Sequence, residues 1–129
     1  MHDALNPPSI RAPFGRYSHG VLVGEGQRLI LTSGQLGIHP DDSVPDSVAE
    51  QAELIFNNLA AILAEGGMSL ADIVRINAFV TDRAHMRDYM AVRDRFVGSP
   101  PPASTLVIVS GFTRPEFKIE IEVTAAKPV

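Results

Sequence analysis

The fold depends most on one stretch near the end of the sequence, Lys118-Ile119-Glu120-Ile121-Glu122-Val123-Thr124-Ala125-Ala126. Apolar and polar side chains alternate along most of it. Because successive side chains of a strand point to opposite faces, the stretch predicts a strand with one apolar and one polar face. The apolar face is expected to pack against helices. The polar face carries Glu120 and Glu122, so it either meets water or lines a polar site.

Two amphipathic helices are expected to supply that packing. Ser47 and Glu50 have the spacing of a capping box, which satisfies amide groups at a helix start. The apolar stripe that follows has spacings of three and four and consists of Val48, Ala52, Ile55, Leu59 and Ile62. Gly66-Gly67 is expected to end this helix. Asp82 is expected to cap a second helix over about 83–97. Its shared face holds Met86, Tyr89, Met90, Arg93 and Phe96.

Four further strands are predicted, at residues 18–23, 28–33, 73–81 and 103–110. Gly24-Glu25-Gly26 predicts a hairpin turn between the first two. Residues 1–15 are rich in proline and are expected to be extended, and residues 36–46 are expected to form a loop. The resulting order, β-β-α-β-α-β-β, indicates a two-layer α+β fold in which residues 1–129 form a single domain.

The second face of the predicted sheet is not covered by these helices. Val107, Val109 and Leu31 or its neighbours are expected on that face, where exposure to water would be costly. We therefore expect this face to be buried against other copies of the chain, most simply in a closed cyclic assembly.

Composition narrows the possible function classes. The chain of 129 residues has no cysteine, which excludes disulfides, thiolate metal ligands and a cysteine nucleophile. The formal net charge of −4 does not favour nucleic-acid binding. No apolar run approaches the ~20 residues of a membrane span, and no signal peptide is evident, so a cytoplasmic protein is expected. The four histidines lack the spacing of a helical metal site, and no metal is expected.

Polar residues gather at the ends of the predicted strands. They are Tyr17, Ser18 and His19, then Ser33, Gly34 and Gln35, then Ser104 and Thr105, and finally Glu120. Each also has a structural explanation. Tyr17 can wedge a sheet edge, His19 can be a hydrogen-bonded edge histidine, and Glu120 can face bulk water. Spacing alone does not decide between structural and catalytic roles.

A family resemblance bears on that choice. The segments that carry it are Gly15-Arg16-Tyr17-Ser18-His19-Gly20, Leu31-Thr32-Ser33-Gly34-Gln35, residues 71–80, Pro102-Ala103-Ser104-Thr105 and residues 115–122. In these segments the chain resembles the RidA family, also called the YjgF/YER057c/UK114 family. The resemblance implies a chorismate-mutase-like fold and a homotrimer whose sheets form a central barrel. It also implies three ligand clefts between neighbouring subunits.

The best-known members of that family hydrolyse reactive enamines and imines, such as 2-aminoacrylate, to a keto acid and ammonia. The imine carbon is already electrophilic, so the protein has to hold the substrate, supply a proton and aim a water. The resemblance therefore implies a deaminase that needs no metal or organic cofactor. Its partners would be a small-molecule ligand and its own copies, without nucleic acid or membrane.

One departure from the family pattern concerns the substrate's carboxylate. The family holds it with an arginine directly after Pro-Ala in the fourth-strand motif, and this chain has Ser104 there. A serine lacks the charged fork, and that loss is expected to cost on the order of 2 to 5 kcal/mol of binding. Two further family positions are Leu106 and Met90 here, which predicts a less charged cleft. Arg16, Arg93 and Arg114 are the candidate replacement cations.

The remaining site residues match the family pattern, and the resemblance implies their roles. Glu120 positions or activates water, Tyr17 closes over the substrate, and Ser33, the Gly34 amide, Ser104 and Thr105 offer hydrogen bonds. His19 is a candidate proton shuttle near neutral pH. The function predicted first is hydrolysis of an altered imine or enamine substrate. The alternative is a non-catalytic small-molecule binding or regulatory trimer, and a ribonuclease role comes third.

Overall fold

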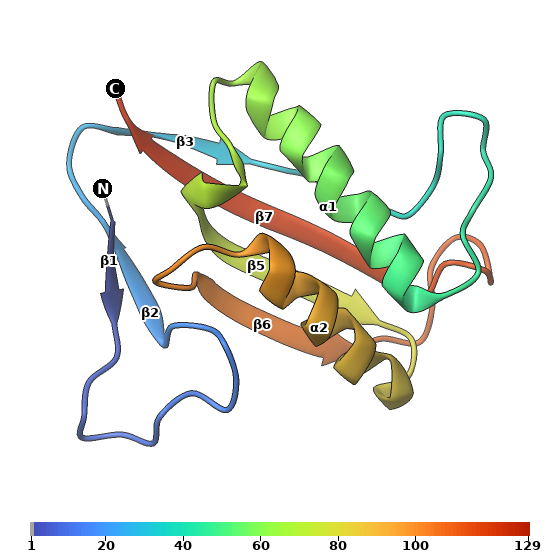
Figure 1. Ribbon diagram of the computed structural model, residues 1–129, viewed down its shortest axis with the longest axis horizontal. Coiled ribbons are helices and arrows are strands. Elements are labelled where there is room, and N and C mark those ends of the chain that lie inside the picture. Colours follow the sequence, from blue (N-terminus) through green and yellow to red (C-terminus); the bar gives the residue numbers. More distant parts are fainter. Residues whose placement is uncertain (1) are drawn as a thin grey trace.

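The last strand, β7 (Ile119–Pro128), lies inside the main sheet of the computed structural model, which describes residues 2–129 (Figure 1). β3 (Gln27–Leu31) and β4 (Gln35–Leu36) pair with it antiparallel along one edge. β5 (Ile73–Val80) pairs antiparallel along the other edge, and β6 (Ala103–Ile108) lies parallel to β5. The strand predicted from the alternation is therefore present, and the structure shows that it has neighbours on both sides.

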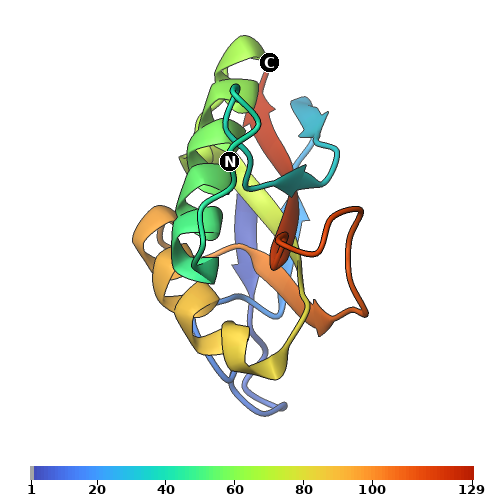
Figure 2. The ribbon, with the colours of Figure 1, turned by 90° about the vertical axis from the view of Figure 1, so that its right-hand side faces the viewer.

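Both helices, α1 (Val48–Glu65) and α2 (Met86–Phe96), pack on one face of this sheet (Figure 2). α2 connects β5 to β6, which explains how these two strands can run parallel. Short 3-10 turns, η1 (Leu70–Asp72) and η2 (Arg83–His85), precede β5 and α2. The predicted two-layer α+β fold is confirmed.

The helix boundaries follow the local signals closely. The Glu50 amide donates to the Ser47 hydroxyl over 3.0 Å, and that hydroxyl donates to the Glu50 carboxylate over 2.9 Å. After α1, Gly67 has a φ of 76°, which a residue with a side chain adopts at a cost. Asp82 caps η2 by accepting from the Ala84 amide, so α2 itself begins at Met86, three residues later than predicted.

The core fills the space between the helices and the sheet. The predicted apolar face of β7 is buried there, with Ile119, Ile121 and Val123 at most 3 % exposed. Most of the predicted stripe of α1 is also buried, and Ile62 packs at its margin. Of the residues predicted to share one face of α2, Tyr89 and Arg93 are buried.

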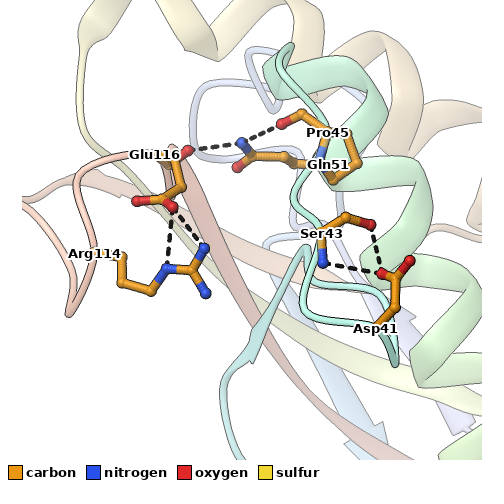
Figure 3. A network of polar contacts seen from close by, with 6 residues as sticks. All are labelled: Asp41, Ser43, Pro45, Gln51, Arg114 and Glu116. Atoms are coloured by element: carbon orange, nitrogen blue, oxygen red, sulfur yellow. Dashed lines mark hydrogen bonds and ion pairs between the residues drawn. The ribbon is translucent and has the colours of Figure 1, made fainter.

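One polar side chain, Gln51 of α1, is fully buried beside this core (Figure 3). Its Nε2 donates to the carbonyl oxygens of Pro45 and Glu116, each over 2.8 Å. Its Oε1 accepts from the Lys118 amide over 2.9 Å. Gly37 packs closely against Gln51, since a Cβ at position 37 would lie 2.8 Å from the Gln51 Cα. Gln51 thus joins the loop before α1 to the segment that enters β7.

The predicted hairpin between residues 18–23 and 28–33 is wrong. β2 (Gly20–Val23) pairs instead with β1 (His2–Leu5), a strand that the sequence predicted only as extended chain. β3 pairs with the far end of β7, from Gln27 opposite Pro128 to Leu31 opposite Thr124. The turn residues between β2 and β3 do redirect the chain, with Gly26 at a φ of 71°. Because β7 has ten residues, it offers β3 a partner that local sequence does not reveal.

The sheet face opposite the helices carries exposed apolar side chains. Leu31 is 72 % exposed and Leu29 is 54 % exposed, and Val107 lies further across the same face. The main sheet of one chain does not close on itself in the part of the chain that the structure describes. The barrel and the trimer therefore stay predictions about the assembly. Within residues 2–129, no helix has the length and apolar character needed to cross a membrane.

Candidate functional site

Glu120 lies on the open face of the sheet, near the start of β7. It is partly buried, and it stands opposite Leu36 on one side and Phe79 on the other. Its carboxylate packs against the backbone of Gly34, because a Cβ at Gly34 would lie 2.6 Å from Cδ and 2.8 Å from Oε2. Only a glycine permits this approach. The structure therefore brings together two of the predicted site residues, and Ser33 lies exposed next to them.

The Glu120 carboxylate makes no hydrogen bond or ion pair with any residue in the described range 2–129. Glu122, two positions further along the same face, differs because its Oε2 accepts from Asn77 Nδ2 over 3.2 Å. The Glu120 oxygens thus keep their acceptor capacity for another donor, whereas Glu122 is engaged within the sheet.

A second group of predicted residues lines a hollow of about 410 Å³ between α2, β6 and the segment 14–17. Its walls are formed by Phe14, Gly15, Tyr17, Met86, Met90, Arg93, Ser104 and Leu106. Most of these side chains are apolar, as Leu106 and Met90 predicted. Tyr17 and Ser104 lie in this hollow as candidate ligand contacts.

Hydrogen bonds to backbone atoms hold the segment that carries Tyr17 in place. The Ser18 amide donates to the Pro102 carbonyl over 3.0 Å, which aligns this segment with the start of β6. Arg16 donates to the carbonyl oxygens of Asp94 and Gly98 at the end of α2, over 2.8 and 3.1 Å. The Tyr17 hydroxyl accepts from the Phe14 amide over 3.1 Å. The position of Tyr17 at the hollow is therefore fixed by its own hydroxyl and by the contacts of its two neighbours in the chain, Arg16 and Ser18.

Of the three arginines that the sequence offered as replacement cations, Arg93 reaches the hollow. Arg16 is used at the end of α2, as described above. Arg114 lies in the connection before β7, where its Nη2 pairs with the Glu116 carboxylate over 2.5 Å (Figure 3). That hydrogen bond holds the pKa of Glu116 below its ordinary value.

The sequence did not single out Tyr89 as a functional residue, yet its hydroxyl is buried beside Arg93 and Ser104. Burial raises the pKa of Tyr89 to about 12, while the positive charge of Arg93 and the nearby Ser104 hydroxyl act to lower it. The phenol therefore stays protonated at neutral pH. The spacing of four residues between Tyr89 and Arg93 is the signal that places both on one helix face.

His19 and Thr105 lie outside this hollow. His19 Nε2 is 2.6 Å from the carbonyl oxygen of Arg11, an acceptor, which requires the proton to be on Nε2. The ring also meets Tyr17 edge-on, with ring centroids 6.2 Å apart. The Thr105 hydroxyl accepts from Arg75 Nη2 over 2.7 Å on the open face. The structure thus separates Thr105 from its neighbour Ser104, as the alternation of a strand requires.

Ser104 and Glu120 belong to opposite faces of the sheet. Ser104 stands opposite Ile76, a buried residue of the helix-covered face. Glu120 stands opposite Phe79, which shares the open face with Val107. One chain therefore presents two candidate partial sites. The acidic one is at Glu120 and Gly34, and the other is the hollow at Tyr17, Arg93 and Ser104. None of the described residues forms a cluster of histidine and carboxylate groups suited to a metal ion.

Known proteins are similar to this chain along nearly its whole length. The sequence model of the family described as Endoribonuclease L-PSP matches residues 9–127. The chain is 35 % identical to protein DfrA of Myxococcus xanthus, over 97 % of this chain and 92 % of that protein. It is 33 % identical to the 2-iminobutanoate/2-iminopropanoate deaminase of Escherichia coli K12, over 98 % and 99 % of the two chains. A crystal structure of a Rid family protein of unknown function from Yersinia pestis superimposes with a TM-score of 0.85, at 26 % identity and 98 % coverage of both chains.

Proposed function

The chain belongs to the RidA (YjgF/YER057c/UK114) family, and from this premise we propose that it hydrolyses small reactive imines or enamines to a carbonyl compound and ammonia. The observation that carries the proposal is the Glu120 carboxylate, partly buried against Gly34 and without a partner among residues 2–129. A carboxylate in that condition is suited to general-base chemistry. The E. coli relative named as an imine deaminase supports the same reaction class.

The proposed reaction consumes one water. An enamine substrate first tautomerises to the imine by gaining a proton on carbon and losing one from nitrogen. Glu120 takes a proton from the water while the water oxygen bonds to the imine carbon, the C=N electron pair moves to nitrogen, and Glu120 returns the proton to that nitrogen. In the second stage the proton of the new hydroxyl group passes through Glu120 to the nitrogen, the C–N bond breaks, ammonia leaves, and the carbonyl group forms. Tyr17 and the apolar walls of the hollow hold the substrate, which keeps the imine carbon near the water.

We propose that the two partial sites meet between copies of the chain. Ser104 and Glu120 point away from opposite faces of one sheet, so they can contact one ligand only if different copies supply them. The exposed leucines on the face of Glu120 support such an assembly, since burying them against another copy removes apolar area from water. A homotrimer with three clefts is the arrangement that the family resemblance implies.

Leu31→Glu tests the assembly. A carboxylate in the middle of the proposed interface would be desolvated without a partner, so we expect the trimer to dissociate into monomers in sedimentation velocity experiments. Ala61→Glu, on the exposed side of α1, is the matched control and should leave the trimer intact. A wild-type chain that sediments as a monomer would contradict the proposed clefts.

The reaction itself is tested by supplying 2-aminoacrylate generated in place by a serine-consuming dehydratase, and by following pyruvate and ammonia. We expect the purified chain to accelerate their release above the rate in buffer, with a smaller effect than a relative that has the strand arginine, because Ser104 has replaced it. A rate equal to that in buffer for imines with and without a carboxylate would count against a deaminase.

The second candidate is a binding or regulatory trimer without turnover. Ser104 favours it, because the family's carboxylate-holding arginine is absent from that position. A ligand that binds and is recovered unchanged would support this candidate. Conversion of the same ligand would exclude it.

A further inference from the structure

The guanidinium of Arg93 is buried at the wall of the hollow. Its side chain is 4 % exposed, and its Nε and Nη2 donate to a single oxygen, Asp94 Oδ1, over 3.1 and 3.0 Å. Asp94 lies on the solvent side, with a side chain that is 42 % exposed. Nη1 makes no hydrogen bond of ordinary geometry with residues 2–129, although the Tyr89 side chain lies close enough to interact with the guanidinium. Asp94 thus orients the guanidinium through two of its nitrogens, and the third has donor capacity for a further acceptor.

Two hydroxyl groups, those of Tyr89 and Ser104, lie beside this guanidinium and near each other. Tyr89 is fully buried, and the centroid of its ring is 5.8 Å from the Arg93 Cζ. Neither the Tyr89 hydroxyl nor the Ser104 hydroxyl makes a hydrogen bond of ordinary geometry among the described residues. A buried hydroxyl without such a bond costs stability, and a protein tolerates that cost where the group has a ligand to bind. A structural role for Arg93 alone explains the contact with Asp94 but not these two hydroxyls.

The geometry points to a carboxylate subsite: we propose that Arg93, Tyr89 and Ser104 together bind the carboxylate of the substrate. In this subsite a guanidinium from α2 takes the role of the arginine that the family carries on the strand, where this chain has Ser104. The apolar walls of Met86, Met90 and Leu106 suit a short hydrocarbon chain next to the carboxylate. This inference rests on the proposed function, and it names the substrate class as small imines that carry a carboxylate and an apolar side chain.

The test measures binding without turnover. The probes are 2-oxobutanoate, the keto acid that corresponds to such an imine, and its uncharged amide, 2-oxobutanamide, both titrated by calorimetry into the wild-type chain. We expect the carboxylate to bind about 30-fold more tightly than the amide, since a buried charge-assisted pair discriminates strongly. Equal affinities for the two probes would overturn the subsite.

Arg93→Met keeps the length of the stem and removes the charge. We expect it to lose the preference for the carboxylate while its affinity for the amide stays within about twofold of the wild type. Arg95→Met is the matched control, since Arg95 lies exposed on the same helix and pairs with Glu53 on the surface. It should keep the preference. A folded Arg93→Met chain that still prefers the carboxylate would overturn the proposal.

Tyr89→Phe decides the question if Arg93→Met does not fold. Removing a buried hydroxyl that makes no hydrogen bond of ordinary geometry should leave the melting temperature unchanged or raise it, while carboxylate binding weakens about fivefold. A structural role for the hydroxyl predicts the reverse, with lower stability and unchanged binding. These readouts are independent of catalysis. A chain that binds 2-oxobutanoate through Arg93 but releases no ammonia would refute the reaction and retain the subsite.

Discussion

Replacing Glu120 by glutamine is expected to reduce kcat/KM for imine hydrolysis by about 100-fold or more, because the amide cannot take the proton from the attacking water. The substitution preserves the size of the side chain, so its contact with Gly34 should persist. The measurement is ammonia release from enzymatically generated 2-aminoacrylate. Binding of 2-oxobutanoate should change little, since its proposed contacts lie in the other partial site.

Glu122→Gln is the control for that experiment. Glu122 lies on the same face of β7, two residues away, and is similarly half-buried, but its carboxylate is bonded to Asn77. We expect this variant to retain most of the activity. If both variants lose activity equally, the effect is one of sheet electrostatics, and Glu120 has no special role.

Gln51→Leu is expected to lower the free energy of unfolding by about 3 kcal/mol, because it leaves several buried backbone groups unpaired. Gln51 donates to two carbonyls and accepts from one amide, and leucine provides none of these bonds. Urea denaturation at one fixed protein concentration measures the change. The concentration has to be fixed because assembly would contribute to the apparent stability.

Asn57→Leu provides the comparison, as Asn57 lies exposed on the same helix. A surface change of this kind is expected to alter the free energy of unfolding by no more than about 0.5 kcal/mol. Equal stabilities of the two variants would mean that water replaces the lost hydrogen bonds of Gln51.

Local patterns predicted the elements of this fold better than their pairing. The alternation of β7, the cap at Ser47 and the glycines after α1 each act within a few residues, and all three appear in the structure. The predicted hairpin failed because the partners of β2 and β3 are decided by distant segments. β3 pairs with residues almost one hundred positions away, and no local signal encodes that register.

The residues of the candidate site were likewise predicted better than their arrangement in space. The sequence placed Gly34 and Glu120 among the site residues, and the structure brings them into contact. It also grouped Thr105 with Ser104, although adjacent residues of a strand face opposite ways, so the period of two already argued against that pairing. Arg93 was one of three candidate cations. Only the packing of α2 against β6 distinguishes it from the other two.

The separation of Ser104 and Glu120 on opposite faces has a genetic consequence if the proposed trimer forms. A defect at Glu120 and a defect at Arg93 would damage different halves of each cleft. In mixed trimers of two such chains, about a quarter of the clefts would receive an intact half from each side. Two alleles that are inactive alone would then complement each other in one cell, and the unit of function would be the junction between chains.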